Sequence, residues 1–427
     1  MRLVSMGSRT LAILGGTPAF QQPLHVGRPN VGDRRRLAAR FDEMLDRGWL
    51  SNNGPLVQAF ERELVRRVGT RHCIPTCNAT VALEVTIRAM GLGGEVIVPS
   101  FTFVATAHAL QIQGITPVFC DIDPASHNID PARVEALITP RTTGILGVHL
   151  WGRPCDTGAL ARIAARHGLH LLFDAAHAFA ASHEKTMIGH FGEAEVFSFH
   201  ATKFINTFEG GAVATNSDAL AEKVRRMINF GFQGYDSVIA LGTNGKMSEA
   251  SAAMGLTNLD SLEEFVAVNR RNYECYREQL DGLEAIRLLD MHSGEPRNYQ
   301  YVIAEVDDSG GGLTRDELLS VLHAENVLAR RYFYPGCHRM APYQRESAAP
   351  GGWLPNTDRV AARVLSLPTG CAVGPHDISV VGAVIHQALA ERARVRAHLA
   401  QDPPPQAARP LATHAAGPPG RSSGPVD

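Results

Sequence analysis

The sequence predicts an α/β fold, with a largely parallel sheet covered by helices on both faces and a smaller second domain. Short apolar runs typical of strands alternate with helical segments between residues 95 and 174, and this alternation is characteristic of βαβ units. The chain has 427 residues, which is more than one small hydrophobic core accommodates. These two observations favour one large α/β domain followed by a smaller one.

The first part of the chain is predicted to form an arm and two amphipathic helices. Residues 1–30 are interpreted as an N-terminal arm. Apolar residues recur with helical spacing at 33–45 and 56–68, which predicts two helices. The polar turn at residues 49–54 joins them.

The alternating stretch predicts the sheet and its ligand-binding edge. The expected strands are residues 95–98, 117–122, 144–150 and 169–173, and the expected helices are residues 106–113, 131–137 and 158–167. Asp130 precedes a proline at the start of the second of these helices and is expected to cap it. Ligands of such sheets bind beyond the carboxyl ends of the strands. Asp174 directly follows one strand and Lys203 follows another by a few residues, so both are expected near this edge.

The second half of the chain is predicted to be helical at first and then α+β. The expected elements are a long helical stretch at 248–283, a strand at 299–306, a helix at 314–323, a strand near Val327 and a helix at 377–399. We therefore expect a large domain over residues 31–265 and a smaller α+β domain over residues 266–400. Residues 401–427 are rich in Pro, Ala, Gly and Arg and are expected to be disordered.

The composition argues against several classes of protein. The 41 basic and 43 acidic residues leave a net charge of -2 with no basic block, so no nucleic-acid partner is expected. Seven cysteines without a CxxC pair indicate a reduced, cytoplasmic setting. No apolar run has the length of a signal-peptide core or a membrane span. The histidines show neither HExxH nor a Cys/His spacing typical of zinc, so no metal is expected.

Lys203 is the residue most suggestive of chemistry. It lies in a turn among the aromatic residues Phe199, Phe204 and Phe208, and the nearest acidic residue along the chain is Glu209. Apolar neighbours desolvate the ammonium group and lower its pKa, which makes the amine a nucleophile. An amine of this kind condenses with a carbonyl group, and the commonest resident carbonyl compound in enzymes is pyridoxal phosphate.

Pyridoxal phosphate needs a carboxylate at its pyridine nitrogen, donors for its phosphate and apolar faces for its ring. Asp174 ends an apolar run and suits the nitrogen, although it could instead cap a helix at residues 175–181. Ala79 and Thr80 open a helical run and suit the phosphate, although a helix start is more often only a cap. Ser198 could add a hydroxyl group. Phe103 could stack on the ring, although such a residue is by default part of a core.

Other chemistries lack their motifs. Residues 242–246 do not have the GxxxxGK[ST] spacing of a phosphate-binding NTPase loop. Residues 91–94 fall short of GxGxxG and precede a strand, which is the wrong place for a dinucleotide site. No GxSxG sequence surrounds Ser198. The sequence therefore favours a lysine-based site.

Residues from about 25 to 400 resemble the vitamin-B6-dependent nucleotide-sugar aminotransferases, a branch of the fold type I (aspartate aminotransferase) superfamily. The motifs that carry the resemblance are residues 49–55, 77–83, 98–103, 173–178, 197–203 and 209–212, in this order. The resemblance implies a mostly parallel seven-stranded sheet between helices, a smaller α+β C-terminal domain, and an obligate homodimer with shared active sites.

The resemblance also implies a role for each candidate residue. Lys203 would form the Schiff base with pyridoxal 5'-phosphate, and Asp174 would pair with the pyridine nitrogen. The other implied cofactor contacts are Phe103, Ala176 and His177 around the ring, and Ala79, Thr80, Ser198 and a neighbouring subunit's Asn244 around the phosphate. Many members have Gln where His177 stands and Gly where Ala79 stands, which are two departures in this chain. Trp49, Asn206 and His338 are assigned to the substrate.

The amino-acid sequences of residues 199–203, 244–249 and 365–370 look most like those of members that aminate C4 of dTDP-4-keto-6-deoxyglucose. The implied reaction moves the amino group of L-glutamate to that carbon and releases 2-oxoglutarate. A 3-keto sugar nucleotide aminotransferase and a non-catalytic regulator that binds a sugar nucleotide or DNA are the alternatives. A vitamin-B6-dependent dehydratase is disfavoured, because that class resembles this chain but has histidine at the position of Lys203.

Overall fold

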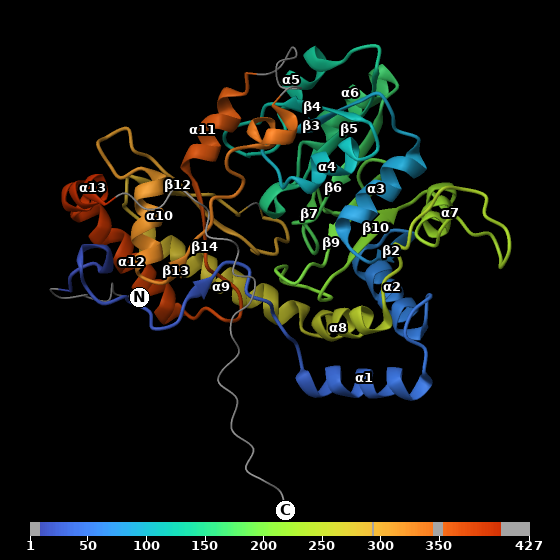
Figure 1. Ribbon diagram of the computed structural model, residues 1–427, viewed down its shortest axis with the longest axis horizontal. Coiled ribbons are helices and arrows are strands. Elements are labelled where there is room, and N and C mark those ends of the chain that lie inside the picture. The colour runs from blue at the N-terminus through green and yellow to red at the C-terminus, as the bar shows by residue number, and fades with distance from the viewer. Residues whose placement is uncertain (1–8, 293, 345–352, 403–427) are drawn as a thin grey trace, which may run out of the picture.

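The computed structural model describes residues 9–292, 294–344 and 353–402 (Figure 1). A seven-stranded sheet with its helices forms the larger lobe on the right of Figure 1, and a three-stranded sheet with its helices forms the smaller lobe on the left. The predicted disordered tail at 401–427 lies outside the described residues, apart from Gln401 and Asp402.

The large sheet has the strand order β2-β10-β9-β6-β5-β3-β4. Its strands are β2 (His72–Thr76), β10 (Gly211–Thr215), β9 (Ala194–Ser198), β6 (His170–Asp174), β5 (Thr142–Val148), β3 (Glu95–Pro99) and β4 (Thr116–Cys120). Within this sheet β10 runs antiparallel to both of its neighbours, and the remaining pairs are parallel. The mostly parallel sheet confirms the predicted fold class.

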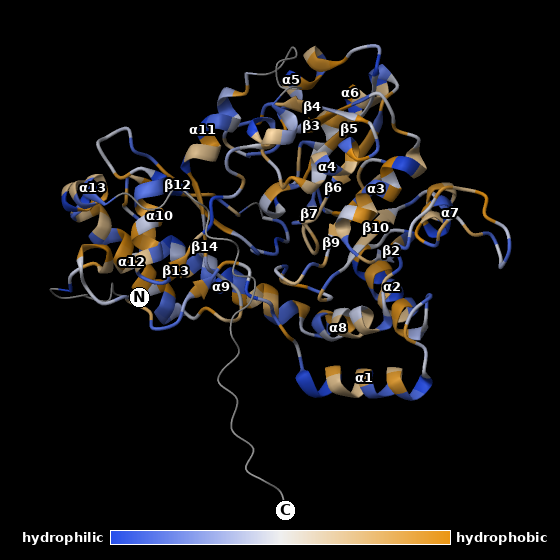
Figure 2. Ribbon diagram, viewed as in Figure 1, coloured by the Kyte–Doolittle hydropathy of each residue, from blue (hydrophilic) through white to orange (hydrophobic). Residues whose placement is uncertain are grey.

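Helices cover both faces of this sheet. They are α2 (Pro55–Val68), α3 (Ala79–Met90), α4 (Ala105–Gln111), α5 (Pro131–Val134), α6 (Thr157–His167), α7 (Asp218–Met227) and α8 (Glu249–Asp260), and α1 (Arg34–Arg47) packs on the outside of α8. Neighbouring residues along a strand face opposite layers, as the pleat requires. Val96 and Val98 pack with α3 and α4, whereas Ile97 packs with α6. The strands are therefore apolar on both faces, and Figure 2 shows hydrophobic colours over this sheet.

The smaller lobe has its own apolar core. Its elements are β11 (Ile286–Leu288), β12 (Val302–Val306), β14 (Val364–Leu367), α9 (Leu262–Leu280), α10 (Arg315–Ala324), α11 (Pro355–Arg363), α12 (Pro375–Ala390) and α13 (Arg392–Gln401). Two pairs of short strands lie outside these two sheets: β1 (Leu24–His25) with β13 (Val327–Leu328), and β7 (Ser182–His183) with β8 (Thr186–Met187). Buried Glu325 accepts hydrogen bonds from the backbone N–H groups of Ala12 and Ala19, both at 2.7 Å. The N-terminal segment is thereby fastened to this lobe.

Four sequence predictions differ from the structure. The helix predicted at 377–399 is two helices, α12 and α13, which meet at Glu391. The long helix predicted at 248–283 is two helices, because the backbone leaves the helical conformation at Ser261. The predicted strand at 299–306 begins only at Val302, since Tyr299 has a φ of 49° that no strand residue adopts. Residues 175–181 form turns and not a helix, so the alternative reading of Asp174 as a helix cap is wrong. Within the described ranges, no helix has the length and apolar character needed to cross a membrane.

Candidate active site

Lys203 and Asp174 meet at the carboxyl ends of two neighbouring parallel strands. Asp174 is the last residue of β6 and pairs with Val196 of β9. The chain leaves β9 after Ser198 and turns at Lys203, whose backbone N–H donates to the carbonyl of His200 at 2.8 Å. The side chain of Lys203 then donates from Nζ to the hydroxyl oxygen of Tyr301 at 3.1 Å. Both residues therefore lie at the edge of the sheet where the sequence predicted them.

The environment of the Lys203 amine makes it an unusually weak base. The residue is half-buried, and the protein atoms packed around its amine lower its pKa to about 8, against the opposing effects of Asp174 and Tyr332. The rings in contact with the amine are not those expected from the sequence. Phe199 and Phe204 belong to the core beneath, and Phe208 is 44% exposed. Tyr301 from the smaller lobe takes that place.

Asp174 is a buried carboxylate with two hydrogen-bond donors. Its Oδ1 accepts from the backbone N–H of Ala176 at 3.0 Å, and its Oδ2 accepts from the hydroxyl of Thr106 at 2.9 Å. Burial raises the pKa of Asp174, while these two hydrogen bonds and Lys203 oppose the rise. A buried carboxylate of this kind is stabilised by a cationic partner. A protonated pyridine nitrogen is such a partner.

The N-terminus of α3 offers free donors for an anion. The side chain of Asn78 caps only the N–H of Val81, at 2.8 Å. Among the described residues, no hydrogen bond reaches the N–H groups of Ala79 and Thr80. Gly211 packs so tightly here that a Cβ would lie 2.7 Å from the nitrogen of Ala79. Since Gly211 pairs with Ser198, the fold brings all three predicted phosphate contacts together at a helix start with a positive dipole end.

The residues predicted around the cofactor ring also converge. Phe103 is 57% exposed although its ring lies only 6.4 Å from that of Phe333, so it presents an open aromatic face. Ala176 and His177 belong to the turn that follows Asp174. The Nδ1 of His177 accepts from the backbone N–H of Trp151 at 3.2 Å. Burial, followed by the charge of Lys203, holds the pKa of His177 well below its usual value, so His177 is neutral and carries its proton on Nε2.

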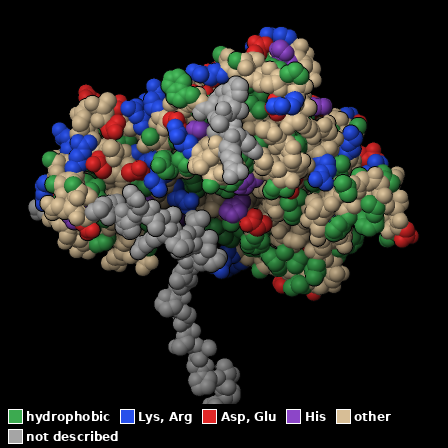
Figure 3. Space-filling model, turned by 45° about the horizontal axis from the view of Figure 1, so that its top comes forward, with side chains coloured by type: hydrophobic (Ala, Val, Ile, Leu, Met, Phe, Trp, Pro, Cys, Tyr) green, Lys and Arg blue, Asp and Glu red, His purple; other side chains and the backbone are tan. Residues whose placement is uncertain are grey.

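These groups fit pyridoxal phosphate. An amine, a buried carboxylate and a helix start with two free N–H groups are what its aldehyde, ring nitrogen and phosphate require. The close packing of Gly211 leaves the helix start without a side chain over it. Figure 3 shows that histidine, basic and acidic side chains gather in the depression between the two lobes.

The structure says less about the roles of the other predicted site residues. Trp49 is exposed and donates from Nε1 to the carbonyl of Ser51 at 2.6 Å. Asn206 is buried, and its amide donates to the carbonyl of Asn30 at 2.8 Å. Asn244 is exposed, and within the described residues it makes no side-chain hydrogen bond to another site residue. The contacts of Trp49 and Asn206 with substrate, and of Asn244 with the cofactor phosphate of a neighbouring subunit, remain predictions.

His338 fastens its segment of the smaller lobe to the large sheet. Its Nδ1 lies 2.7 Å from the hydroxyl of Ser100, and its Nε2 lies 3.2 Å from Oδ1 of Asp358. The backbone N–H of His338 also donates to the hydroxyl of Ser100 at 3.0 Å. Both ring nitrogens therefore face protein groups. The predicted contact of His338 with substrate is likewise still a prediction.

Tyr301, Thr106 and Trp151 were not anticipated from the sequence as site residues. Tyr301 lies 98 residues beyond Lys203, and Thr106 lies 68 residues before Asp174. Tyr301 falls in a stretch whose pattern predicts only a strand. No local signal identifies these contacts, because each depends on how separate elements are packed.

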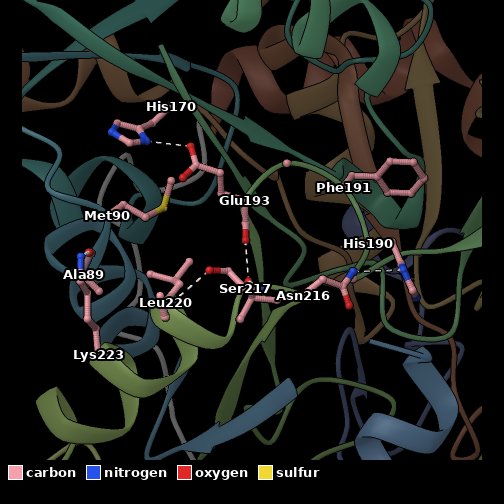
Figure 4. A pocket seen from close by; sticks show the side chains of 14 residues that line it. Ala89, Met90, His170, His190, Phe191, Glu193, Asn216, Ser217, Leu220 and Lys223 are labelled. Carbon is pink, nitrogen blue, oxygen red and sulfur yellow. Dashed lines mark hydrogen bonds and ion pairs between the residues drawn. The ribbon is translucent and has the colours of Figure 1, made fainter. Parts of the chain in front are cut away.

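A cavity of about 470 Å³ lies at the end of the large sheet opposite to the lysine site (Figure 4). It includes His170 at the start of β6 and Thr215 at the end of β10, whereas Asp174 ends β6. In Figure 4 the side chain of Glu193 faces His170, at 2.7 Å. The cavity is therefore separate from the lysine site and has no part in it.

Comparisons with known proteins agree with this geometry. The DegT/DnrJ/EryC1/StrS aminotransferase family matches residues 32–386. A dTDP-4-amino-4,6-dideoxy-D-glucose transaminase of Shigella dysenteriae is 37% identical over 349 residues, covering 82% of this chain and 94% of the relative. Its namesake in Escherichia coli is 35% identical over 345 residues, covering 80% and 92%.

The crystal structure of DesI in the presence of its TDP-sugar product superposes with a TM-score of 0.87 at 51% identity, covering 91% of this chain and 98% of that one. Its likeness extends over both lobes, as does the family match. The chain therefore belongs to the DegT/DnrJ/EryC1/StrS aminotransferase family, whose members use pyridoxal phosphate to transaminate sugars.

Proposed function

We propose that the protein transfers the amino group of L-glutamate to C4 of a dTDP-4-keto-6-deoxyhexose, giving a dTDP-4-amino-4,6-dideoxy sugar and 2-oxoglutarate. The observation that carries the catalytic part is the enclosed Lys203 amine beside Asp174. The choice of sugar is supported by the two transaminases named for dTDP-4-amino-4,6-dideoxy-D-glucose and by DesI, which was crystallised with a TDP-sugar product.

In the proposed reaction, bound pyridoxal phosphate supplies the electron sink that accepts charge when a carbon loses its proton. Lys203 attaches the cofactor and, while its amine is free, takes the α-proton of L-glutamate. Asp174 holds a proton on the pyridine nitrogen. The same residues act in the reverse order on the keto sugar, where Lys203 delivers a proton to C4. Positioned proton transfer of this kind typically contributes ~10²–10⁴ in rate.

The remaining site residues bind and orient. We assign Ala79, Thr80 and Ser198 to the phosphate, because their donors converge at the start of α3. We assign Phe103, Ala176 and His177 to the ring. Asn244 is proposed to reach the phosphate of the opposite subunit, and Trp49, Asn206 and His338 are proposed to contact the sugar nucleotide.

The proposed assembly is a cytoplasmic homodimer. The segment at 228–246 carries exposed apolar side chains, among them Tyr235 at 98% and Leu241 at 78% exposure. Apolar side chains gathered on one protruding segment are typical of a protein–protein interface. The same segment contains Asn244, so an interface here would bring that residue to the other subunit.

The function is tested with L-glutamate and the 3-keto and 4-keto dTDP sugars in separate incubations. NMR of the product identifies the carbon that carries nitrogen, and Lys203→Ala serves as the control for uncatalysed amination. We expect nitrogen at C4 from the 4-keto sugar. Nitrogen only at C3 would replace the proposal with the 3-keto alternative. A colourless protein that borohydride does not modify would instead indicate a non-catalytic binder.

A further inference from the structure

Tyr301 is the hydrogen-bond partner of the reacting amine. The Nζ atom of Lys203 donates to its hydroxyl oxygen at 3.1 Å, and the same atom lies 5.7 Å from the centre of the Tyr301 ring. The titratable groups near enough to interact electrostatically with the amine are Asp174, Tyr332 and neutral His177, and the hydroxyl of Tyr301 contacts it directly. Of these, the hydroxyl of Tyr301 is the one that the structure joins to Nζ by a hydrogen bond.

The Tyr301 ring is held from several sides. His177 lies 4.6 Å away between ring centres, Trp151 lies 5.4 Å away and Tyr332 lies 6.4 Å away. Trp151 is itself fixed, because its Nε1 donates to Nδ1 of His127 at 3.2 Å. Because the ring is packed on several sides, the hydroxyl of Tyr301 is held in a fixed position.

The backbone just before Tyr301 is fastened to both halves of the site. Asn298 donates from Nδ2 to the carbonyls of His177 and Phe179, at 2.8 and 2.9 Å. Gln300 accepts through Oε1 from the backbone N–H of Phe204, the residue after Lys203, at 3.5 Å. The segment that carries Tyr301 is therefore aligned with the turn after Asp174 and with the lysine turn.

From this geometry we propose that Tyr301 is a catalytic residue, whose hydroxyl binds the Lys203 amine while that amine is free and orients it for proton transfer. This inference rests on the proposed function. A neutral amine has two N–H donors and one lone pair. Directing one N–H to Tyr301 leaves the lone pair available to the substrate carbon. Burial raises the pKa of Tyr301 far above its usual value, so the phenol stays protonated and is not itself the base.

The test measures the first half-reaction alone, with the holoenzyme and L-glutamate in single-turnover mode. Wild type, Tyr301→Phe and the control Tyr299→Phe are compared. Tyr299 lies two positions earlier, is buried and packs against Tyr273 at 5.4 Å, away from Lys203. Loss of one hydrogen bond to a reacting group predicts a rate about 5–30-fold lower in Tyr301→Phe and no such loss in Tyr299→Phe.

The second readout is the pKa of Lys203 in full-length protein freed of cofactor, from the pH dependence of its acylation followed by mass spectrometry. The hydroxyl accepts from the ammonium form more strongly than from the amine, so Tyr301→Phe should lower this pKa by about half a unit or more. A merely structural role would slow the reaction without moving this pKa.

The proposal is overturned by a Tyr301→Phe rate within twofold of wild type, or by a slower rate with an unchanged Lys203 pKa. If Tyr301→Phe does not fold, 4-methylphenylalanine at 301 fills the space of the hydroxyl, and 4-aminophenylalanine restores a polar atom there. Recovery of the rate only with the amino group supports the proposal, and equal rates overturn it. A wild-type protein that does not react with L-glutamate would count against the proposed function and not against the role of Tyr301.

Discussion

Gly211 at the start of β10 lies against Ala79 at the start of α3, so closely that a Cβ on Gly211 would come within 2.7 Å of the Ala79 nitrogen and 2.8 Å of its Cα. The neighbours are backbone atoms, which cannot turn aside as a side chain can. Strand β10 and the free donors of α3 are thereby held in one fixed arrangement.

Gly211→Ala should displace the first turn of α3 and weaken cofactor binding. We expect at least about a tenfold rise in the Kd of pyridoxal phosphate, since even one charge-assisted hydrogen bond contributes about 1.5–3 kcal/mol. Fluorescence titration of the cofactor-free protein measures this constant. The control is Gly310→Ala, because a Cβ at Gly310 meets no atom within 4 Å. Equal affinity in both variants would show that α3 does not hold the phosphate.

Lys203→Ala should abolish turnover without unfolding the protein. The amine is the group that attaches the cofactor and moves the proton, and no other lysine within the described residues lies beside Asp174. Reduction with borohydride followed by mass spectrometry should find the cofactor on residue 203 in wild type and nowhere in the variant. Lys223→Ala, which removes an exposed lysine of α7, should behave as wild type. Substantial activity in Lys203→Ala would contradict the assignment.

The reaction with L-glutamate should become faster as the pH rises towards 8. Lys203 must be neutral to accept a proton, and its pKa is lowered to about 8 from 10.5. The neutral fraction then rises about fivefold between pH 7 and pH 8 and levels off above pH 9. A series of single-turnover rates at different pH values measures this rise of the rate with pH, which is the pH limb of the reaction. A rate at saturating L-glutamate that continues to rise to pH 10 would indicate a lysine with an ordinary pKa.

Asp174→Asn should lower the rate and also move this pH limb to lower pH. Asp174 raises the pKa of Lys203 by its charge, so removing that charge lowers the pKa. Loss of the carboxylate at the pyridine nitrogen should reduce the rate by about 10²–10³-fold. Thr106→Val, which removes one donor to Asp174, should cause a smaller loss. A slower variant with an unmoved limb would mean that Asp174 does not face the amine in solution.

Charged residues on the exposed apolar segment should disrupt the proposed dimer. Tyr235→Asp combined with Leu241→Asp places two carboxylates where the most exposed apolar side chains of that segment stand. Light scattering after gel filtration should give about the mass of one chain for this variant and twice that mass for wild type. Asp substitutions at the exposed residues Trp353 and Ile112 serve as the matched control.

Local sequence patterns alone predicted several strands, a helix cap and two residues of the site. Alternating apolar runs predicted the strands from β3 to β6, and the cap at Asp130 is confirmed by its hydrogen bond to the N–H of Ala132 at 3.0 Å. Lys203 was identified as a lysine among aromatic residues and Asp174 as a carboxylate that ends an apolar run. Both were expected near one edge of the sheet, because each follows a strand and the ends of parallel strands share that edge. Such features depend on a few neighbouring residues, which the sequence displays directly.

Only the tertiary structure decided the surroundings of the amine. The sequence assigned its desolvation to Phe199, Phe204 and Phe208, whereas the contacting hydroxyl comes from Tyr301 of the smaller lobe. The reversal of β10 and the break at Ser261 were also not predicted. Each of these features follows from packing between segments far apart in the chain. The hydropathy periodicity of one segment does not identify the distant segment against which it packs.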